Sequence, residues 1–301
     1  MIAPDTAPTW AWPHGAKLAL SIVVNVEEGS EYSLRDGDAM PEPVDELGIV
    51  MKKAVRMHGN ESNYRYGINE GAPRVLAALG AHQLPATWAA AALSLERAPT
   101  LAQAITARGD EVCSHGWRWV HQFRLNEADE RAFIRRAAES IQTTTGTRPV
   151  GWLSRYLHTE HTRRLLQEEG FTYQMDDYSA DTPFWGDVDG GTGPMVVVPY
   201  ALDSNDMKMW TAPAYTPDFW LKYACDTFDE LLQEAQQNNR APRLMSLGLH
   251  LRIIGRPGRI GALRRFFEHI APARANGQVW VCTRRAVAAH FAAAVPRRLH
   301  A

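Results

Sequence analysis

The chain has 301 residues, of which 45% are hydrophobic and 22% charged, and its formal net charge is −2. This balance excludes the strongly basic surface that binding to nucleic acid or an anionic membrane requires, so we expect a small-molecule partner. The three cysteines, Cys113, Cys225 and Cys282, form no CxxC pair and are typical of a reducing compartment. We find no signal peptide and no apolar stretch long enough to cross a bilayer, and therefore expect a cytoplasmic protein.

The predicted elements alternate between buried strands and helices. The first strand, Lys17–Val26, is a near-continuous run of Val, Ile and Leu, typical of a strand buried on both faces of a parallel sheet. Residues Tyr32–Gly71 are polar and lack a clear period, apart from a possible short helix at Glu46–Met57, so we expect a lid or interface insertion there. The helices that follow are predicted at Ala72–Gln83, Thr100–Arg108 with Thr100 as cap, Asn126 to about Thr144 with Asn126 as cap, Thr159–Gly170, Pro217–Gln237, Ile260–Ile270 and after the cap Thr283. The strands between them are predicted at Ala86–Ala89, Glu111–Cys113, Gly151–Leu153, Phe171–Met175, Met195–Val198, Leu244–Leu249 and Gln278–Cys282, with loops at Asp181–Trp185 and Asp203–Asp206.

About seven strand–helix units predict a single α/β domain over residues 1–301, with a parallel sheet closed into a barrel. In barrels of this type the catalytic residues lie at the carboxyl ends of the strands. Polar residues recur just past the predicted strands of this chain: Glu27, Glu28, His115, Arg155, Asp176, Asp181 and His250. Each of them alone could be a helix cap or a surface charge, but so many at equivalent positions indicate an active site.

The stretch Glu111–Trp119, EVCSHGWRW, contains the clearest candidate pocket. Its apolar start predicts the end of a buried strand that brings His115 to the strand terminus, where Gly116 lets the chain turn. A histidine beside aromatic residues at such a terminus is how α/β proteins build a pocket. One buried histidine is as often a hydrogen-bonded core residue, so the assignment depends on the other strand ends.

Two adjacent carboxylates, Glu27 and Glu28, end the first strand. Neighbouring residues on a strand point to opposite sides, so one of the pair faces inward. Because adjacent carboxylates and partial burial both raise a carboxyl pKa, either residue suits a general base working near neutrality. Tyr66 beside Arg65, at the end of the insertion, either lines the same pocket or packs the insertion down.

These motifs together resemble the polysaccharide deacetylase superfamily, typified by the chitooligosaccharide deacetylases, and within it the branch that contains the cofactor-independent bacterial allantoinases. The resemblance extends from about Trp12 to Phe291. It rests on the order and spacing of Asn25–Gly29 (NVEEG), Ser114–Trp119 (SHGWRW), Thr162–Gly170 (TRRLLQEEG), Asp176–Trp185 (DDYSADTPFW), Pro199–Met207 (PYALDSNDM) and Ser246–Arg259 (SLGLHLRIIGRPGR). It implies a deformed (β/α) barrel, a hydrolase of C–N bonds other than peptide bonds, and a homo-oligomer.

The resemblance also implies residue roles, with one departure. The first motif of the metal-dependent members holds two aspartates, a general base and a metal ligand, where this chain has Glu27 and Glu28. Their second motif holds two histidine ligands four residues apart, where this chain has His115 and Trp119. The indole nitrogen carries a proton, so Trp119 cannot bind a divalent cation and the usual ligand set is broken. We therefore expect no metal or other cofactor; zinc or another divalent ion held by Glu28 and His115 is the alternative.

Arg155 matches the third motif and His250 the last, where the family has a general acid. Our hypothesis is that Glu27 or Glu28 activates a water, which then opens a small cyclic amide such as an allantoin-like ureide or a cyclic imide. His115 would orient the carbonyl or the water, Arg155 would stabilise the developing oxyanion or hold a substrate carbonyl, and His250 would protonate the leaving nitrogen.

The other candidates are supporting residues. Asp176 is expected to orient a catalytic partner, and the predicted substrate contacts are Tyr66, Trp117, Trp119, Asp181 and Trp185, whose tryptophans would wall a flat ring. Two alternatives stay open. A metal-dependent deacetylase of N-acetylated sugars needs a ligand to replace Trp119, and a catalytically inactive barrel would only bind its ligand. The joint retention of Glu27, His115 and His250 argues against the inactive barrel.

Overall fold

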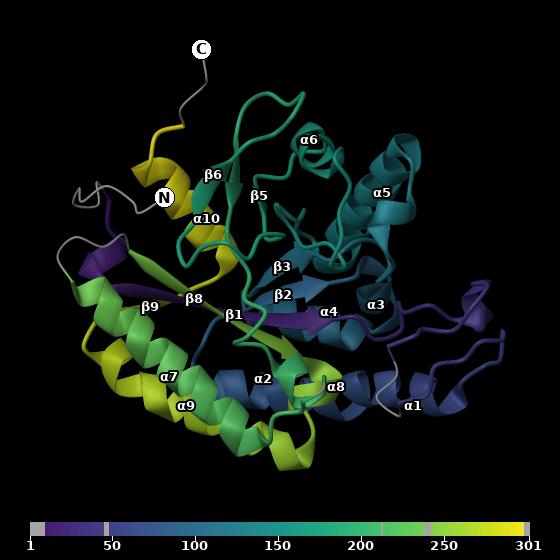
Figure 1. Cartoon of the computed structure of the whole chain (residues 1–301), viewed down its shortest axis with the longest axis horizontal. Helices are drawn as coiled ribbons and strands as arrows, with labels where there is room; N and C mark the ends of the chain where they lie inside the picture. The colour runs from purple at the N-terminus through teal and green to yellow at the C-terminus, as the bar shows by residue number, and fades with distance from the viewer. Residues whose placement is uncertain (1–9, 45–47, 212, 238–241, 298–301) are drawn as a thin grey trace.

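The structure, a computed structural model, describes residues 10–44, 48–211, 213–237 and 242–297. A strongly curled sheet runs through its centre (Figure 1). Its strands are β1 (Leu18–Val26), β2 (Thr87–Ala90), β3 (Glu111–Ser114), β4 (Gly151–Trp152), β5 (Tyr173–Gln174), β6 (Phe184–Gly186), β7 (Met195–Val197), β8 (Arg243–His250) and β9 (Val279–Val281). They follow the order β6-β7-β5-β4-β3-β2-β1-β8, and β9 pairs with the start of β1. Among the described ladders only that between β6 and β7 is antiparallel, so the α/β class and the parallel sheet are confirmed, in the form of an open half-barrel.

Helices pack around this sheet; most lie on its outer face, whereas Phe291 of the last helix packs with Ala19 and Val23 on the other face. They are α1 (His58–Tyr66), α2 (Ala72–Ala81), α3 (Ala92–Arg97), α4 (Pro99–Ala107), α5 (Glu127–Thr145), α6 (Thr162–Glu168), α7 (Pro217–Gln236), α8 (Leu251–Ile254), α9 (Pro257–Ala275) and α10 (Arg284–Ala294). The shorter turns are the 3₁₀ helices η1 (Pro13–Gly15), η2 (Leu34–Asp36), η4 (Gln122–Arg124) and η5 (Asp206–Met209), and the π-helical turn η3 (Gly67–Gly71). The long helices α7 and α9 lie side by side next to β8 (Figure 1). Within the described ranges, none of these helices has both the length and the apolar character needed to cross a membrane.

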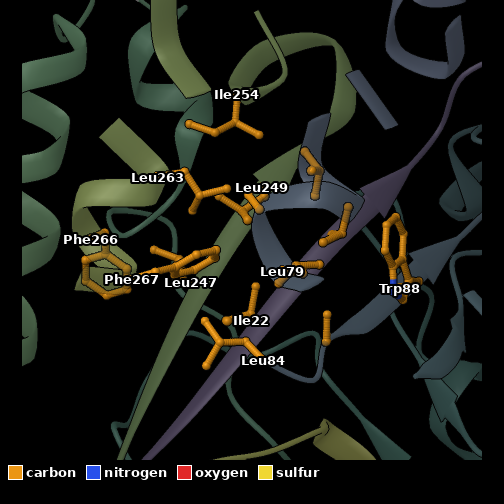
Figure 2. Close-up of a cluster of buried hydrophobic side chains, with 14 of the residues drawn as sticks. Ile22, Leu79, Leu84, Trp88, Leu247, Leu249, Ile254, Leu263, Phe266 and Phe267 are labelled. Carbon is orange, nitrogen blue, oxygen red and sulfur yellow. The ribbon is translucent and has the colours of Figure 1, made fainter. Parts of the chain in front are cut away.

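Strand β1 divides the core into an outer and an inner half. All its residues are buried, as the apolar run predicts. Ile22 and its even-numbered neighbours face the helices, where they pack with Leu79 of α2 and Phe267 of α9 (Figure 2). The odd-numbered Ala19 and Val23 face the interior of the half-barrel. Burying one such aliphatic side chain contributes about 1.5–3 kcal/mol, so this two-sided burial holds the register of β1 firmly.

The alternation along β1 decides where its terminal carboxylates point. If the alternation of side chains continues past Val26, the odd-numbered Glu27 faces the interior of the half-barrel and Glu28 faces the helices. The ladders run Val26–Ala90 and Ala90–Ser114, so His115 follows β3 at the level where Glu27 follows β1. The carboxyl ends of β1, β3 and β8 therefore meet at one edge of the sheet.

Three predicted elements differ from the structure. The helix expected at 46–57 is wrong for residues 48–57, which are not helical, and residues 46 and 47 lie outside the described ranges. The helix that follows is α1, in which Asn60 and Tyr64 are buried one turn apart. Phe184 and Trp185, expected in a loop, belong to the antiparallel edge strand β6. Thr100 is not a cap, because α4 begins at Pro99, a residue that favours the first helical position. The predicted cap Asn126 is confirmed, since its side chain accepts a hydrogen bond from the Asp129 amide.

Candidate active site

A cavity of about 260 Å³ opens at the carboxyl ends of the strands. It is lined by Asn25, Glu27, His115, Trp119, Leu153, Ser154, Arg155, Tyr156, Tyr178, Tyr200, Leu202, Asn205, Met207, Lys208, Thr211 and His250. Five of the predicted site residues are among them, and they come from segments far apart in the sequence: Glu27, His115, Trp119, Arg155 and His250. We call this the strand-end cavity.

Glu27 lies at the centre of the charged groups of the cavity. Its Oε2 accepts a hydrogen bond from Arg252 Nη1 at 2.7 Å, and its Oε1 faces His250 Nε2 at 3.4 Å and His115 Nε2 at 3.7 Å. Burial acts to raise the pKa of Glu27, but the Arg252 guanidinium and the His250 imidazole outweigh it and hold this pKa well below its usual range. The carboxylate is therefore ionised at neutral pH, although it is only 2% exposed.

His250 forms a dyad with Asp206 of η5. Its Nδ1 lies 2.7 Å from Asp206 Oδ1, while Asp206 Oδ2 accepts hydrogen bonds from the backbone amides of His250 and Ile254. Burial acts to lower the pKa of His250, but the Glu27 and Asp206 carboxylates raise it to about 10. The ring is therefore an imidazolium at neutral pH, with Nε2–H directed at the cavity side.

His115 has the opposite hydrogen-bonding character at its cavity-facing nitrogen. Its Nδ1 lies 2.7 Å from the Leu153 carbonyl oxygen, which can only accept, so Nδ1 carries the proton. In the neutral ring Nε2 is then an acceptor, 3.7 Å from Glu27 Oε1. Two acceptor atoms, His115 Nε2 and Glu27 Oε1, consequently face the same point of the cavity.

Glu28 points away from the strand-end cavity. Its Oε2 accepts from the Glu27 amide at 3.0 Å and its Oε1 from the Arg252 amide at 3.2 Å. Gly67 passes so close that a Cβ there would clash with Glu28 Oε1. Burial raises the pKa of Glu28 to about 7 against the opposing effect of Arg252, with a further contribution from Glu27. The expectation that both carboxyl pKa values are raised is thus corrected: the two values diverge, because Glu27 has the stronger cationic partners.

Arg155 is held by the insertion. Its guanidinium donates to both oxygens of Glu42, at 2.8 and 2.6 Å, and to the Trp119 carbonyl at 2.8 Å. The same group stacks 3.6 Å above the Trp119 ring. All three side chains are buried, so this arrangement ties the insertion to the cavity wall and commits most of the charge of Arg155 to Glu42.

Tyr200 forms a polar part of the cavity wall. Its hydroxyl oxygen accepts hydrogen bonds from Asn25 Nδ2 at 2.9 Å and Asn205 Nδ2 at 3.2 Å. Gly248 provides the space, since a Cβ there would clash with this hydroxyl. Burial raises the pKa of Tyr200, so the phenol keeps its proton and can donate it.

Tyr156 lies at the cavity wall in a strained backbone conformation. Its φ is +59°, and the Leu157 amide closes a three-residue turn by donating to the Arg155 carbonyl at 2.7 Å. A left-handed conformation costs a non-glycine residue about 1–2 kcal/mol. Such strain concentrates at functional sites. Here the strained residue, Tyr156, follows Arg155 directly and lines the cavity.

Four predicted substrate contacts lie outside the strand-end cavity. Trp117 packs under the Arg136 guanidinium of α5, at 3.2 Å from the ring centre. Trp185 donates to the Val295 carbonyl and packs against Phe291. Both rings are half-buried and pack against a helix instead of the cavity.

Tyr66 and Asp181 are also placed elsewhere. Tyr66 on α1 accepts a hydrogen bond from Arg74 and stacks 3.6 Å from Arg256, which supports the alternative that it packs the insertion. Asp181 lies in a neighbouring cleft, where its backbone carbonyl accepts from the Leu244 amide.

Asp176 acts on the backbone at the cavity edge. Its Oδ1 accepts from the Ser154 amide at 2.8 Å and its Oδ2 from Gln174 Nε2 at 2.9 Å. Ser154 lines the cavity, whereas Asp176 does not. Asp176 therefore holds the backbone of Ser154, a residue of the cavity wall.

Sequence reasoning missed Arg252, Asp206 and Glu42. Arg252 and Asp206 lie inside the stretches that carry the family resemblance, and this position was the signal that could have identified them. Arg252 is also the second residue after His250. Glu42 lies in the insertion, which has no periodic pattern, so the sequence offered no signal for it. All three are charged and buried, so each needs a partner of opposite charge.

The residues at this edge do not form a usual metal site. Trp119 stands where a second histidine ligand is expected, and its ring is covered by Arg155. Glu28 and His115, the alternative ligand pair, are not brought together, because Glu28 is turned toward Gly67. Among the described residues, no group of three or more His, Cys, Asp or Glu side chains is arranged to hold a metal ion. A divalent cation beside Glu27 would also face the Arg252 guanidinium and the His250 imidazolium.

Comparison with known proteins identifies the family of this chain. A family model described as Polysaccharide deacetylase matches residues 62–174. A curated relative from Schizosaccharomyces pombe, named "Putative polysaccharide deacetylase", is 33% identical over an alignment of 314 positions, which covers 97% of this chain and 94% of the relative. The chain belongs to the polysaccharide deacetylase family. The resemblance inferred from the motifs is confirmed, and the chain is a member of a hydrolase family that acts on C–N bonds.

Two solved structures share the whole fold. The "probable Polysaccharide deacetylase" from Pseudomonas aeruginosa PAO1 is 36% identical, with a TM-score of 0.87 and 95% of each chain covered. PuuE allantoinase is 38% identical, with a TM-score of 0.87, 95% of this chain covered and 94% of that chain. Relatives with a deacetylase name and with an allantoinase name are therefore equally similar, and the choice of substrate depends on the cavity.

Proposed function

We propose that this protein hydrolyses a C–N bond of a small cyclic amide, a ureide or imide ring, with Glu27 as general base and without a metal ion. The observation that carries the proposal is the convergence of two imidazole nitrogens on one carboxylate oxygen. His115 Nε2 and His250 Nε2 lie 3.7 and 3.4 Å from Glu27 Oε1, and one nitrogen is an acceptor and the other a donor.

The size and the walls of the cavity favour a single ring. Its volume of about 260 Å³ lies below the range of about 300–1,000 Å³ that drug-sized ligands occupy. Tyr156, Tyr178, Leu202 and Met207 give it largely apolar walls suited to a flat ring. An extended polysaccharide needs an open groove instead, and this favours the cyclic amidase over the sugar deacetylase.

A water between Glu27 and His115 is the proposed nucleophile. It would donate one hydrogen to Glu27 Oε1 and the other to His115 Nε2, leaving an oxygen lone pair directed at the carbonyl carbon of the ring. As its oxygen bonds to that carbon, one proton passes to Glu27. The low pKa of Glu27 makes it a weak base, so part of the rate must come from holding water and ring in this geometry.

Departure of the nitrogen is the second proposed step. The Tyr200 O–H and the Arg155 guanidinium line the cavity as donors for the oxyanion. When the C–N bond breaks, His250 Nε2–H protonates the nitrogen, and Asp206 stabilises the imidazolium until then. The proton on Glu27 returns to His250, whose Nε2 lies 3.4 Å away, so that the net reaction adds one water across the bond.

The first test is turnover with and without exhaustive chelation, on allantoin, hydantoin, succinimide and an N-acetylglucosamine oligomer. We expect ring opening that survives chelation, because the proposed groups are all side chains of the protein. Zinc-dependent release of acetate from the oligomer would instead support the sugar deacetylase. Purified Glu27→Gln protein, whose activity on the ring should be greatly reduced, shows that the activity does not come from a contaminant.

The pH dependence tests the proposed general acid. Because the pKa of His250 is raised to about 10, kcat/KM should stay high through neutrality and fall as pH rises through about 10. The contribution of His250 to stability depends on pH in the same direction. It is fully present below the pKa of histidine in the unfolded chain, near 6.5, and is lost as pH rises through the pKa of His250 in the folded protein. Asp206→Asn removes one of the raising charges, so the alkaline limb should move to lower pH. An unchanged alkaline limb in this variant would remove His250 from the proton transfer.

A further inference from the structure

Among the described residues, the charged side chains that line the strand-end cavity have partners of opposite charge, with one exception. Glu27 faces Arg252 at 2.7 Å, His250 faces Asp206 at 2.7 Å, and Arg155 binds both oxygens of Glu42. In each pair one member lines the cavity and the other lies behind it or in its wall. These pairs leave the substrate side of the cavity close to neutral.

The exception is Lys208 of η5, which lines the cavity. Among the described residues its ammonium has neither an ion-pair nor a hydrogen-bond partner. Its backbone is well held, because its amide donates to the Asn205 carbonyl at 3.1 Å and its carbonyl accepts from the Tyr215 amide at 2.7 Å. Lys208 therefore presents one uncompensated positive charge from a fixed position, two residues after Asp206.

The surroundings of Lys208 strengthen this charge. The cavity walls are mainly aromatic and aliphatic, and a charge interaction is much stronger beside such walls than in water. A neighbouring cleft carries Asp203, Asp226 and Glu230, but these carboxylates are exposed and solvent weakens their effect. A ring that fills the cavity would displace water from Lys208 and leave its charge unpaired unless the ring supplies an anion.

We infer that the substrate is a cyclic amide that carries one negative charge, such as a carboxylate substituent, and that Lys208 pairs with it. This inference rests on the proposed ring-opening function and narrows its substrate class. The lysine would select the substrate by charge, while the aromatic walls accept the ring. Lys208 is then a specificity-determining residue and takes no part in proton transfer.

The test compares two rings that differ in one carboxylate, hydantoin and hydantoin-5-acetate. In Lys208→Met, kcat/KM for hydantoin-5-acetate should fall by about 10- to 100-fold, the loss expected for one charge-assisted contact, mainly through KM. For hydantoin it should change less than about threefold. Lys208→Arg should restore most of the selectivity. Lys52→Met, which removes an exposed lysine outside the cavity, should leave both rings unaffected.

Calorimetric binding of both rings to the wild type and to Lys208→Met separates this inference from the proposed function. Carboxylate-dependent binding that is lost in Lys208→Met supports the anionic ligand, even if neither ring is opened and the cyclic amidase is wrong. If Lys208→Met opens both rings and its kcat/KM falls equally on both, or on neither, the role of Lys208 is overturned and the amidase stands. Absence of both binding and turnover for both rings overturns the two together.

Discussion

Glu27→Gln should lower kcat/KM for a ring amide by about 10²–10⁴-fold, the range for loss of a general base. The substituted glutamine would keep the volume of the side chain, but its amide cannot accept the proton from water. Glu28→Gln should lower kcat/KM by less than about tenfold, because Glu28 points toward Gly67 and only supports the backbone of Glu27 and Arg252. Steady-state kinetics of both purified variants measures the difference.

The two variants form a matched pair, since each replaces one buried carboxylate at the end of β1. Equal losses would mean that the orientation of the two side chains does not decide the role, and the base assignment would fail. Circular dichroism and thermal unfolding should accompany the kinetics. Glu28→Gln loses one of two accepted backbone hydrogen bonds, which should cost about 1 kcal/mol.

Arg252→Met should have the largest effect on stability. It leaves the Glu27 carboxylate buried without its 2.7 Å partner, and breaking a buried pair from one side costs about 3–5 kcal/mol of the free energy of unfolding. The control is Arg265→Met, which breaks an ion pair with Asp218 that is equally short but exposed, and should cost about 0–1 kcal/mol. Urea unfolding compares the two variants directly.

The same substitution should change the pH dependence. In the wild type the pKa of Glu27 is depressed, so its contribution to stability is present above the unfolded value near 4.5 and disappears as pH falls through the lower folded value. Without Arg252 this pKa rises, and the acid limb of kcat/KM should move to higher pH. If Arg252→Met does not fold, Arg252→Lys gives the profile with the charge retained. An acid limb that stays in place would mean that Arg252 does not set the pKa of Glu27.

A double-mutant cycle completes this comparison. Glu27→Gln combined with Arg252→Met removes both charges, and we expect it to be more stable than Arg252→Met alone, because no unpaired ion stays buried. Additive losses in the double variant would show that the two side chains do not depend on each other.

The sequence determined the strand-end residues of this site. The adjacent carboxylates at the end of β1 predict that one of Glu27 and Glu28 faces inward, and the structure shows that Glu27 does. The strand runs before His115 and His250 placed both histidines at the same edge of the sheet. Periodicity carries this information because a buried strand has only two faces and each is chosen by local hydrophobicity.

The tertiary structure alone decided the partners of those residues. Arg252 and Glu27 are 225 positions apart, and Arg155 and Glu42 are 113 apart, so no local pattern links them. The same holds for Trp117: His115 and Trp119, two positions away on either side, line the cavity, while the Trp117 ring packs under Arg136. The packing of distant elements decides which buried charges meet, and it leaves the half-buried Lys208 without a partner among the described residues. The same packing sets the pKa values and the charge that a substrate meets.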